Sequence, residues 1–258
     1  EMLRSLVGSE MCIRDSTTAA QVTANSTHFQ SWNNNGFTLG SGFTAYENFS
    51  GIVDGIVSWS FRKAEKFFDI QTWTGNDVQG REISHALGST PGCIICKDLT
   101  NASANWIVYN SGTGATKATY LNTNSTAVTA SLFWDNTAPT DSVFTIGDFS
   151  SINASGRNYV AYIFASDAGG FGDDGDEAMV KVGSYTTDGS ATAKHIDLGF
   201  EPQWVIKKKI SGADNWEMYD TIRGWTAPDD TYGVSSSQVL RANLASAEAA
   251  NTSSPGPT

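Results

Sequence analysis

The feature that most constrains this chain is a stretch that occurs twice. Residues 87–109 read LGSTPGCIICKDLTNASANWIVY, and residues 198–219 read LGFEPQWVIKKKISGADNWEMY. Both copies have a Leu-Gly start, a proline turn, a short apolar run that reaches a lysine, a polar loop and an Asn-Trp pair. Matched turn and core residues about 110 positions apart indicate two copies of one small structural unit.

The sequence around these copies has the residue pattern of β-strands. Val57, Trp59 and Phe61 alternate with serines, which is the period-two pattern of a half-buried strand. The pattern returns about 100 positions later as Val160, Tyr162 and Phe164. We therefore predict an all-β fold of tandem β-sandwich domains, either jelly-roll or immunoglobulin-like, each of about 100 residues.

The phase of the repeat predicts the domain boundaries. One complete β-domain is expected at 67–164, and the copies on either side are expected to be incomplete. The flanking segments are the closing part of a preceding repeat at 17–61, a charged linker at 62–66, an acidic glycine-rich linker at 165–178 and a partial second β-domain at 179–258. Near the end of the second copy, Leu240 and Asn243 echo Leu121 and Asn124.

The first sixteen residues, EMLRSLVGSEMCIRDS, lack the threonine, asparagine and glycine texture that begins at Thr17. The stretch SLVGSEMCIRD resembles a translated sequencing-adapter sequence that recurs in assemblies of environmental transcripts. We therefore interpret residues 1–16 as an artefact and leave them out of the reasoning about the fold. A short natural leader is the alternative.

The composition limits the partners. Lys and Arg total 16 against 27 Asp and Glu, a net charge of −11. Binding to nucleic acid requires a basic face, so neither nucleic acid nor an anionic membrane is expected as a partner. No apolar run approaches the roughly 20 residues that cross a bilayer, so membrane insertion is not expected either.

The chain has three cysteines, and this odd number argues against a disulfide framework. Cys93 and Cys96 form a C-x-x-C, but residues three apart on a strand point to opposite faces. The second copy carries Trp204 and Lys207 at these positions. We therefore predict two structural cysteines rather than a metal or redox pair.

A candidate calcium site lies in the acidic linker, where Asp173, Asp174 and Asp176 cluster between glycines. Clustered carboxylates suit calcium, although the spacing of a helix-loop-helix calcium site is missing. The alternative is a solvated linker without a cation. No other cofactor is expected.

Trp73, Tyr185 and Trp225 are candidate ligand-binding residues, because each is expected at the end of a strand beside a turn. Exposed aromatic rings there could stack on the rings of a sugar. The alternative is that they form the rim of the core.

An enzyme is not expected. Asp69, Glu82, Asp98 and Asp135 could in principle pair as the carboxylates of a glycosidase. Nothing in the sequence holds two of them at the required separation of about 5–10 Å.

Several motifs carry a resemblance to a known family. They are WSFRKAEKFFDIQTWTG, ISHALGSTPGCIICK and NWIVY, followed by FTIG, NASGRNYVAYIFA, LGFEPQWVIKK and NWEMYDTIRGW. In this order they resemble a repeat family in virion structural proteins of marine bacteriophages, often labelled tail-fibre-like, and the resemblance covers most of the chain.

The resemblance implies a module of a virion appendage that spaces toward or attaches to the host surface. It implies location in the virion, other virion proteins as partners and a homo-oligomer such as a trimer. It supplies no catalytic residues. The alternative functions are a lectin-like carbohydrate-binding module that takes a host surface glycan and, behind it, a polysaccharide-degrading enzyme.

Overall fold

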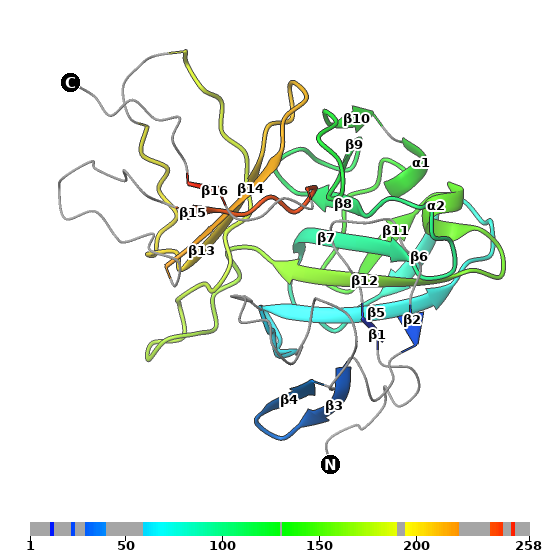
Figure 1. Ribbon diagram of the computed structural model, residues 1–258, viewed down its shortest axis with the longest axis horizontal. Helices are drawn as coiled ribbons and strands as arrows, with labels where there is room; N and C mark the ends of the chain where they lie inside the picture. The colour runs from blue at the N-terminus through cyan, green and yellow to red at the C-terminus, as the bar shows by residue number, and fades with distance from the viewer. Residues whose placement is uncertain are drawn as a thin grey trace, which may run out of the picture.

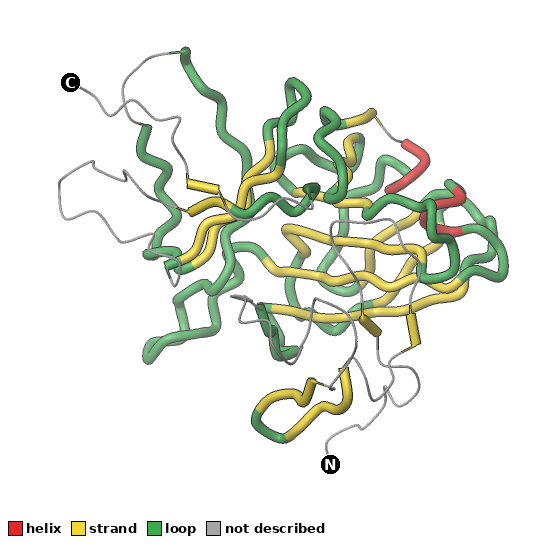
Figure 2. The backbone as a smooth tube through the Cα atoms, viewed as in Figure 1, coloured by secondary structure: helices red, strands yellow, loops and turns green. Residues whose placement is uncertain are grey.

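The computed structural model shows an all-β protein, as predicted from the sequence (Figure 1). Strands and loops make up nearly all of the described chain, and its two helices, α1 (Ser131–Trp134) and α2 (Ser150–Asn153), have four residues each (Figure 2). The residues that the structure describes are 11–12, 22–23, 29–39, 59–129, 131–189, 194–221, 238–244 and 249–250.

A six-stranded antiparallel sheet forms the centre of the molecule, with the strand order β10-β9-β8-β7-β12-β5. Strand β12, late in the sequence, lies between β7 and β5 (Figure 1). This insertion ties together the two ends of the predicted 67–164 domain. The strands are β5 (Phe68–Thr74), β7 (Pro91–Asp98), β8 (Ile107–Asn110), β9 (Lys117–Tyr120), β10 (Val128–Thr129) and β12 (Asn158–Ala165).

Five smaller two-stranded sheets accompany the central one among the described residues. Four are paired from consecutive strands, and the fifth pairs β6 with the distant β11. The strands are β1 (Met11–Cys12), β2 (Val22–Thr23), β3 (Phe29–Asn33), β4 (Gly36–Leu39), β6 (Arg81–Ser84), β11 (Val143–Ile146), β13 (Trp204–Lys208), β14 (Trp216–Asp220), β15 (Gln238–Val239) and β16 (Ala249–Ala250).

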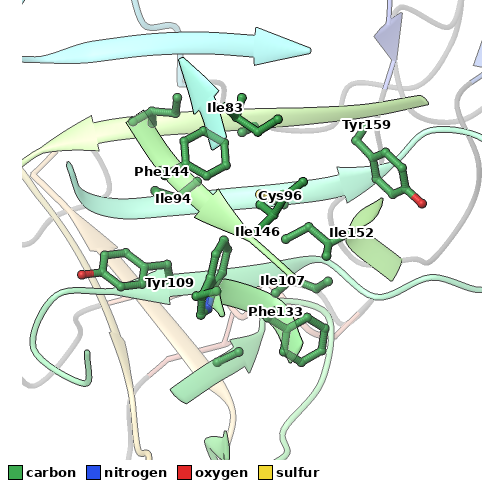
Figure 3. Close-up of a cluster of buried hydrophobic side chains, with 14 of the residues drawn as sticks. Ile83, Ile94, Cys96, Ile107, Tyr109, Phe133, Phe144, Ile146, Ile152 and Tyr159 are labelled. Carbon is green, nitrogen blue, oxygen red and sulfur yellow. The ribbon is translucent and has the colours of Figure 1, made fainter. Parts of the chain in front are cut away.

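The main core lies on one face of the central sheet, which we call the front face (Figure 3). The β6–β11 ribbon and the two short helices cover this face. Alternate residues of each central strand point into it, as the period-two pattern requires. Each large apolar side chain buried here contributes about 1.5–3 kcal/mol. The sheet supplies Ile94, Cys96, Ile107, Tyr109, Tyr159, Ala161 and Ile163, and the cover supplies Ile83, Phe133, Trp134, Phe144, Ile146 and Ile152.

The two copies of the repeat form the same hairpin. Strands β7 and β8 pair with Ile95 opposite Val108, and β13 and β14 pair with Ile206 opposite Met218. These four residues are equivalent in the aligned copies. The register of the pairing is therefore repeated together with the sequence.

An asparagine clasp opens the second strand of both hairpins. In the first copy the Trp106 backbone N–H donates to Asn122 Oδ1 over 2.9 Å, and Asn122 Nδ2 donates to Asn105 Oδ1 over 2.9 Å. In the second copy the corresponding bonds join Trp216 to Asn243 over 2.8 Å and Asn243 to Asn215 over 2.7 Å.

The clasp corrects one sequence correspondence. Asn243 is the structural equivalent of Asn122, not of Asn124 as the sequence spacing suggested. Leu240 pairs with Met218, whereas Thr119 pairs with Val108 in the first copy, so Leu240 matches Thr119 and not Leu121. More residues separate β14 from this strand in the second copy than separate β8 from β9 in the first, and this shifts the alignment.

Both hairpins also contain a lysine that makes the same hydrogen bond. Lys97 Nζ donates to the Ala104 carbonyl over 2.7 Å, and Lys208 Nζ donates to the Asp214 carbonyl over 2.8 Å. Each amine bridges the loop between the two strands of its hairpin. The lysine that ends the apolar run is thus part of the architecture of the unit.

The β13–β14 hairpin of the second copy packs on part of the second face of the central sheet, which we call the back face. One buried cluster joins them, and it contains equivalent residues from the two copies. Trp216 Nε1 also donates to the Tyr120 carbonyl of the first copy over 2.8 Å. We call this set the shared cluster; it comprises Trp106, Val108, Leu121, Trp216, Met218 and Ala242, with Ile95 and Ile206 packed against it.

Removal of one tryptophan from the shared cluster tests how much the cluster contributes to the stability of the fold. Trp216→Ala is expected to lower the free energy of unfolding by about 3–5 kcal/mol, because it leaves a large cavity between the copies. Chemical denaturation followed by fluorescence measures this. Trp32→Ala, at a tryptophan that is 72% exposed, is the control and should change stability by less than about 0.5 kcal/mol. Equal effects of the two substitutions would contradict the assignment.

Candidate functional site

The acidic residues predicted to bind calcium lie on a tight turn. Phe171 and Glu177 exchange two backbone hydrogen bonds, of 3.2 and 3.0 Å. The glycines between them adopt positive φ, which only glycine does without strain. Asp173, Asp174 and Asp176 are exposed on this turn. Within the described ranges, no group of three or more His, Cys, Asp or Glu side chains is placed to hold a metal ion.

Trp73, predicted to stack on a sugar, lies in the main core. Its side chain is only 7% exposed, and its ring stacks on Tyr159 with 5.5 Å between the centroids. Its Nε1 donates to the Ile152 carbonyl over 3.0 Å. Both its ring face and its polar atom are used inside the protein, so Trp73 is not available to a ligand in the folded state.

The other two predicted ligand residues have different positions. Tyr185 is 53% exposed, and it follows Ser184, whose Oγ donates to the Gly112 carbonyl over 2.9 Å. This bond places Tyr185 beside the loop that follows β8. Trp225 lies outside the described residues. The structure therefore does not join Trp73 and Tyr185 into one aromatic site.

Asp69 is fully buried, and its carboxylate accepts hydrogen bonds from nearby backbone N–H groups. Oδ2 accepts the Ala86 N–H over 2.7 Å, Oδ1 accepts the Ile70 N–H over 2.9 Å, and Lys63 Nζ lies 2.6 Å from Oδ1. Burial on its own would raise the pKa of this carboxyl, but the hydrogen bonds from Lys63, Ala86, Gln71 and Ile70 outweigh it. The pKa of Asp69 is thus lowered below its ordinary value of 3.8.

Asp98 is also fully buried and caps the loop after β7. Oδ1 accepts the backbone N–H groups of Thr100 and Asn101, each over 2.8 Å, and Oδ2 lies 3.2 Å from Arg157 Nη1. Like Asp69, it is engaged by the chain's own groups.

The two remaining carboxylates do not complete a catalytic pair. Glu82 is exposed on β6, and Asp135 accepts a 2.6 Å bond from Gln79 Nε2. Asp69, Asp98 and Asp135 each bond to different neighbours, and none of these bonds joins two carboxylates.

Cys93 and Cys96 point to opposite faces of β7, as predicted. Cys96 belongs to the main core, whereas Cys93 packs against the shared cluster. Burial raises the pKa of Cys93 to about 12, and it raises that of Cys96 further. Thiols with such pKa values are protonated at neutral pH and are poor nucleophiles and metal ligands.

One apolar cavity of about 270 Å³ opens at the β9–β10 end of the central sheet. Phe133 and Phe149 meet edge to face there, with 4.8 Å between their ring centroids. Tyr120 is the only titratable residue in its wall, so the cavity offers shape and apolar contact rather than acid–base chemistry. Its lining residues are Tyr120, Val128, Thr129, Ser131, Leu132, Phe133 and Phe149.

Sequence reasoning did not find this cavity. Leu132, Phe133 and Trp134 are contiguous apolar residues, which resemble a buried strand. The structure forms the short helix α1 there, and Asp135 and Asn136 follow it with positive φ values of 48° and 53°. The aspartate and asparagine were the available signal, because these residues tolerate the left-handed conformation.

The comparison with known families covers almost the whole chain. The family model DUF7483, described as a domain of unknown function, matches residues 2–255. The chain belongs to this family. The match includes both hairpins, so both copies of the repeat lie within the DUF7483 region. No curated protein and no solved structure matches the chain. In the described part of this DUF7483 chain, no helix is long and apolar enough to cross a membrane.

The lowered pKa of Asp69 predicts a pH dependence. A carboxyl whose pKa is lowered in the folded state adds stability above its unfolded pKa and loses it as the pH falls through the folded pKa. Asp69→Asn should therefore cost about 1–3 kcal/mol at pH 7, and the difference from the wild type should shrink below about pH 4. Denaturant titrations at pH 7 and pH 3 measure it.

Glu82→Gln is the matched control for this measurement, because Glu82 is an exposed carboxylate on a neighbouring strand. It should leave stability within about 0.5 kcal/mol of the wild type at both pH values. A cost of Asp69→Asn that stays constant between pH 7 and pH 3 would argue that the carboxylate charge contributes nothing.

The cysteine geometry predicts slow thiol chemistry. In a Cys12→Ser background, native protein at pH 8 should react only slowly with a disulfide reagent, since Cys96 is buried, Cys93 is half-buried and both thiols are protonated. Addition of denaturant should expose both thiols within seconds. Rapid labelling of the native protein would show that β7 is accessible to solvent.

Proposed function

We propose that this DUF7483 chain is a non-enzymatic structural module of a phage virion appendage, of the tail-fibre kind, built from tandem β-sandwich units. The observation that carries the proposal is the shared cluster. Equivalent residues of the two copies, such as Trp106 and Trp216, are buried in one apolar cluster. A repeat that packs on its own copy gives a stiff joint, which is what a spacer requires.

The polar interior supports the same role. Asp69, Asp98 and Lys97 are buried, and their hydrogen bonds hold backbone groups of their own loops. These side chains fix the conformation of the strands and turns. Groups that act in catalysis are instead expected to converge on a common space.

The module would act in the virion with other virion proteins as partners, as a homo-oligomer such as a trimer, and would space toward or attach to the host surface. The order of motifs shared with marine phage structural proteins supports this setting. The acidic surface, with a net charge of −11, suits a partner that is not a polyanion.

Detection in particles tests the proposed function. Peptides of the chain should co-sediment with capsid proteins when virus particles from the source sample are separated on a density gradient and analysed by mass spectrometry. The free-protein fraction of the same gradient is the control. Peptides confined to that fraction would contradict a role in the virion.

A lectin-like module is the second candidate, and the exposed ring of Tyr185 favours it. A ring that is 53% exposed beside a loop can stack on a sugar. Tyr185→Ala should then weaken binding to any glycan identified on an array by about two- to tenfold, because stacking on one aromatic ring contributes about 0.5–1.5 kcal/mol. Thr186→Ala, its neighbour, is the control. An array without any hit argues against this candidate.

A further inference from the structure

The second hairpin has an open edge where the first has a strand. In the first copy, β7 pairs with β8 on one side and with β12 on the other. Strand β13 occupies the place of β7 in the second copy, and within the described residues it pairs with β14 alone. The edge of β13 away from β14 therefore corresponds to the edge on which β12 lies in the complete unit.

One described segment of the chain has the side chains that this edge requires. Trp59 and Phe61 correspond in sequence to Tyr162 and Phe164 of β12. In the complete unit Phe164 lies opposite Cys93, whose equivalent is Trp204. The Trp59 ring already lies beside Trp204, with 6.1 Å between the centroids. Side chains of the β12 pattern thus meet the start of β13.

The lysines of β13 do not protect this edge. Lysine on an edge strand usually prevents pairing. Lys207 instead forms an ion pair with Glu217 over 3.0 Å, and Lys208 clasps the Asp214 carbonyl. Both amines are turned into their own hairpin, where they leave the edge open.

Strand β5 also lies at the edge of a sheet, but local contacts protect its outer edge from pairing with another strand. Ala64 forms an antiparallel bridge with Phe68, the Ile70 N–H is taken by Asp69, and Arg81 Nη1 donates to the Thr74 carbonyl over 2.6 Å. Several backbone groups on its outer side therefore have partners. Among the described residues, no strand or bridge pairs with the β13 edge away from β14.

The segment 59–61 is partly exposed, and ring contacts hold it to the rest of the chain, including those of Phe61 with Phe67 and Phe68. Trp59 and Trp204 are each 36% exposed, although their rings are in contact. Phe61 rests on Phe164 with 5.3 Å between the centroids. A short connection then leads to β5, and in it Lys66 adopts a φ of 61°, a turn that can serve as a hinge.

We propose that copies of this chain associate by strand exchange: the segment Trp59–Phe61 of one copy pairs with the β13 edge of a second copy. The pairing is antiparallel, with Phe61 opposite Trp204 and Trp59 opposite Ile206, as β12 pairs with β7. Packing of Trp59 against the start of β13 within one chain is replaced by packing of the same segment on β13 of the second copy, so the apolar area that is lost is regained between chains. The inference specifies how copies of the proposed appendage module join, and so rests on that function.

A designed disulfide tests the register. In the proposed pairing Ser60 lies opposite Val205, so Ser60→Cys with Val205→Cys in a Cys12→Ser background should cross-link under mild oxidation. Non-reducing electrophoresis of the full chain should show dimers and larger species that a reductant converts to monomer. Ser60→Cys with Ser211→Cys, which places the second thiol in the loop beyond β13, is the control and should give less than a tenth of that product.

The other outcomes overturn the proposal. A cross-link found only within single chains shows that the segment stays on its own β13, and the absence of a cross-link shows that it does not pair there. As a second measurement, Trp59→Ala should weaken self-association at least tenfold in sedimentation equilibrium, whereas Phe37→Ala should not. Chain peptides in virus particles, together with an exclusively intramolecular cross-link, would reject exchange and leave the structural role intact.

Discussion

The shared cluster, in which Trp106 and Trp216 are both buried, is the contact on which the arrangement of the two copies depends. Trp106 directly precedes β8 and Trp216 begins β14, and an asparagine clasp holds the backbone N–H of each tryptophan. Because the same surface is used from both sides, the contact resembles the interface of a twofold dimer inside a single chain.

This geometry has a consequence for the repeat as a building unit. A surface that packs against its own equivalent is used up once two copies have met, so it joins units in pairs and cannot extend a row. Any longer assembly has to use another surface. The edge of β13 is such a surface, because it differs from the shared cluster in both chemistry and position, and it offers backbone hydrogen bonds in place of apolar area.

The sequence was sufficient to predict the parts of the fold that depend on local pattern. The repeat, the β-class and the divergence of Cys93 and Cys96 all follow from periodicity. The burial of Trp73 did not follow, because an aromatic residue at a strand end looks the same whether a distant segment covers it or not. Its cover, the Ile152 carbonyl and the Tyr159 ring, comes from about 80 residues further along the chain. The roles of Asp69 and Asp98 were hidden for the same reason, since their partners Ala86 and Arg157 are not neighbours in sequence.

The shared cluster can be completed only late in the synthesis of the chain. The first copy can form its hairpin as soon as Trp106 and Asn122 have left the ribosome, but the cover of its back face arrives only with Trp216. At a translation rate of about 5–20 residues per second, the interval of about 94 residues between Asn122 and Trp216 lasts roughly 5–20 seconds. Throughout that time Trp106 and Val108 lack the cover that the second copy provides. The second copy of the repeat thus completes the burial of an apolar surface that the first copy leaves open.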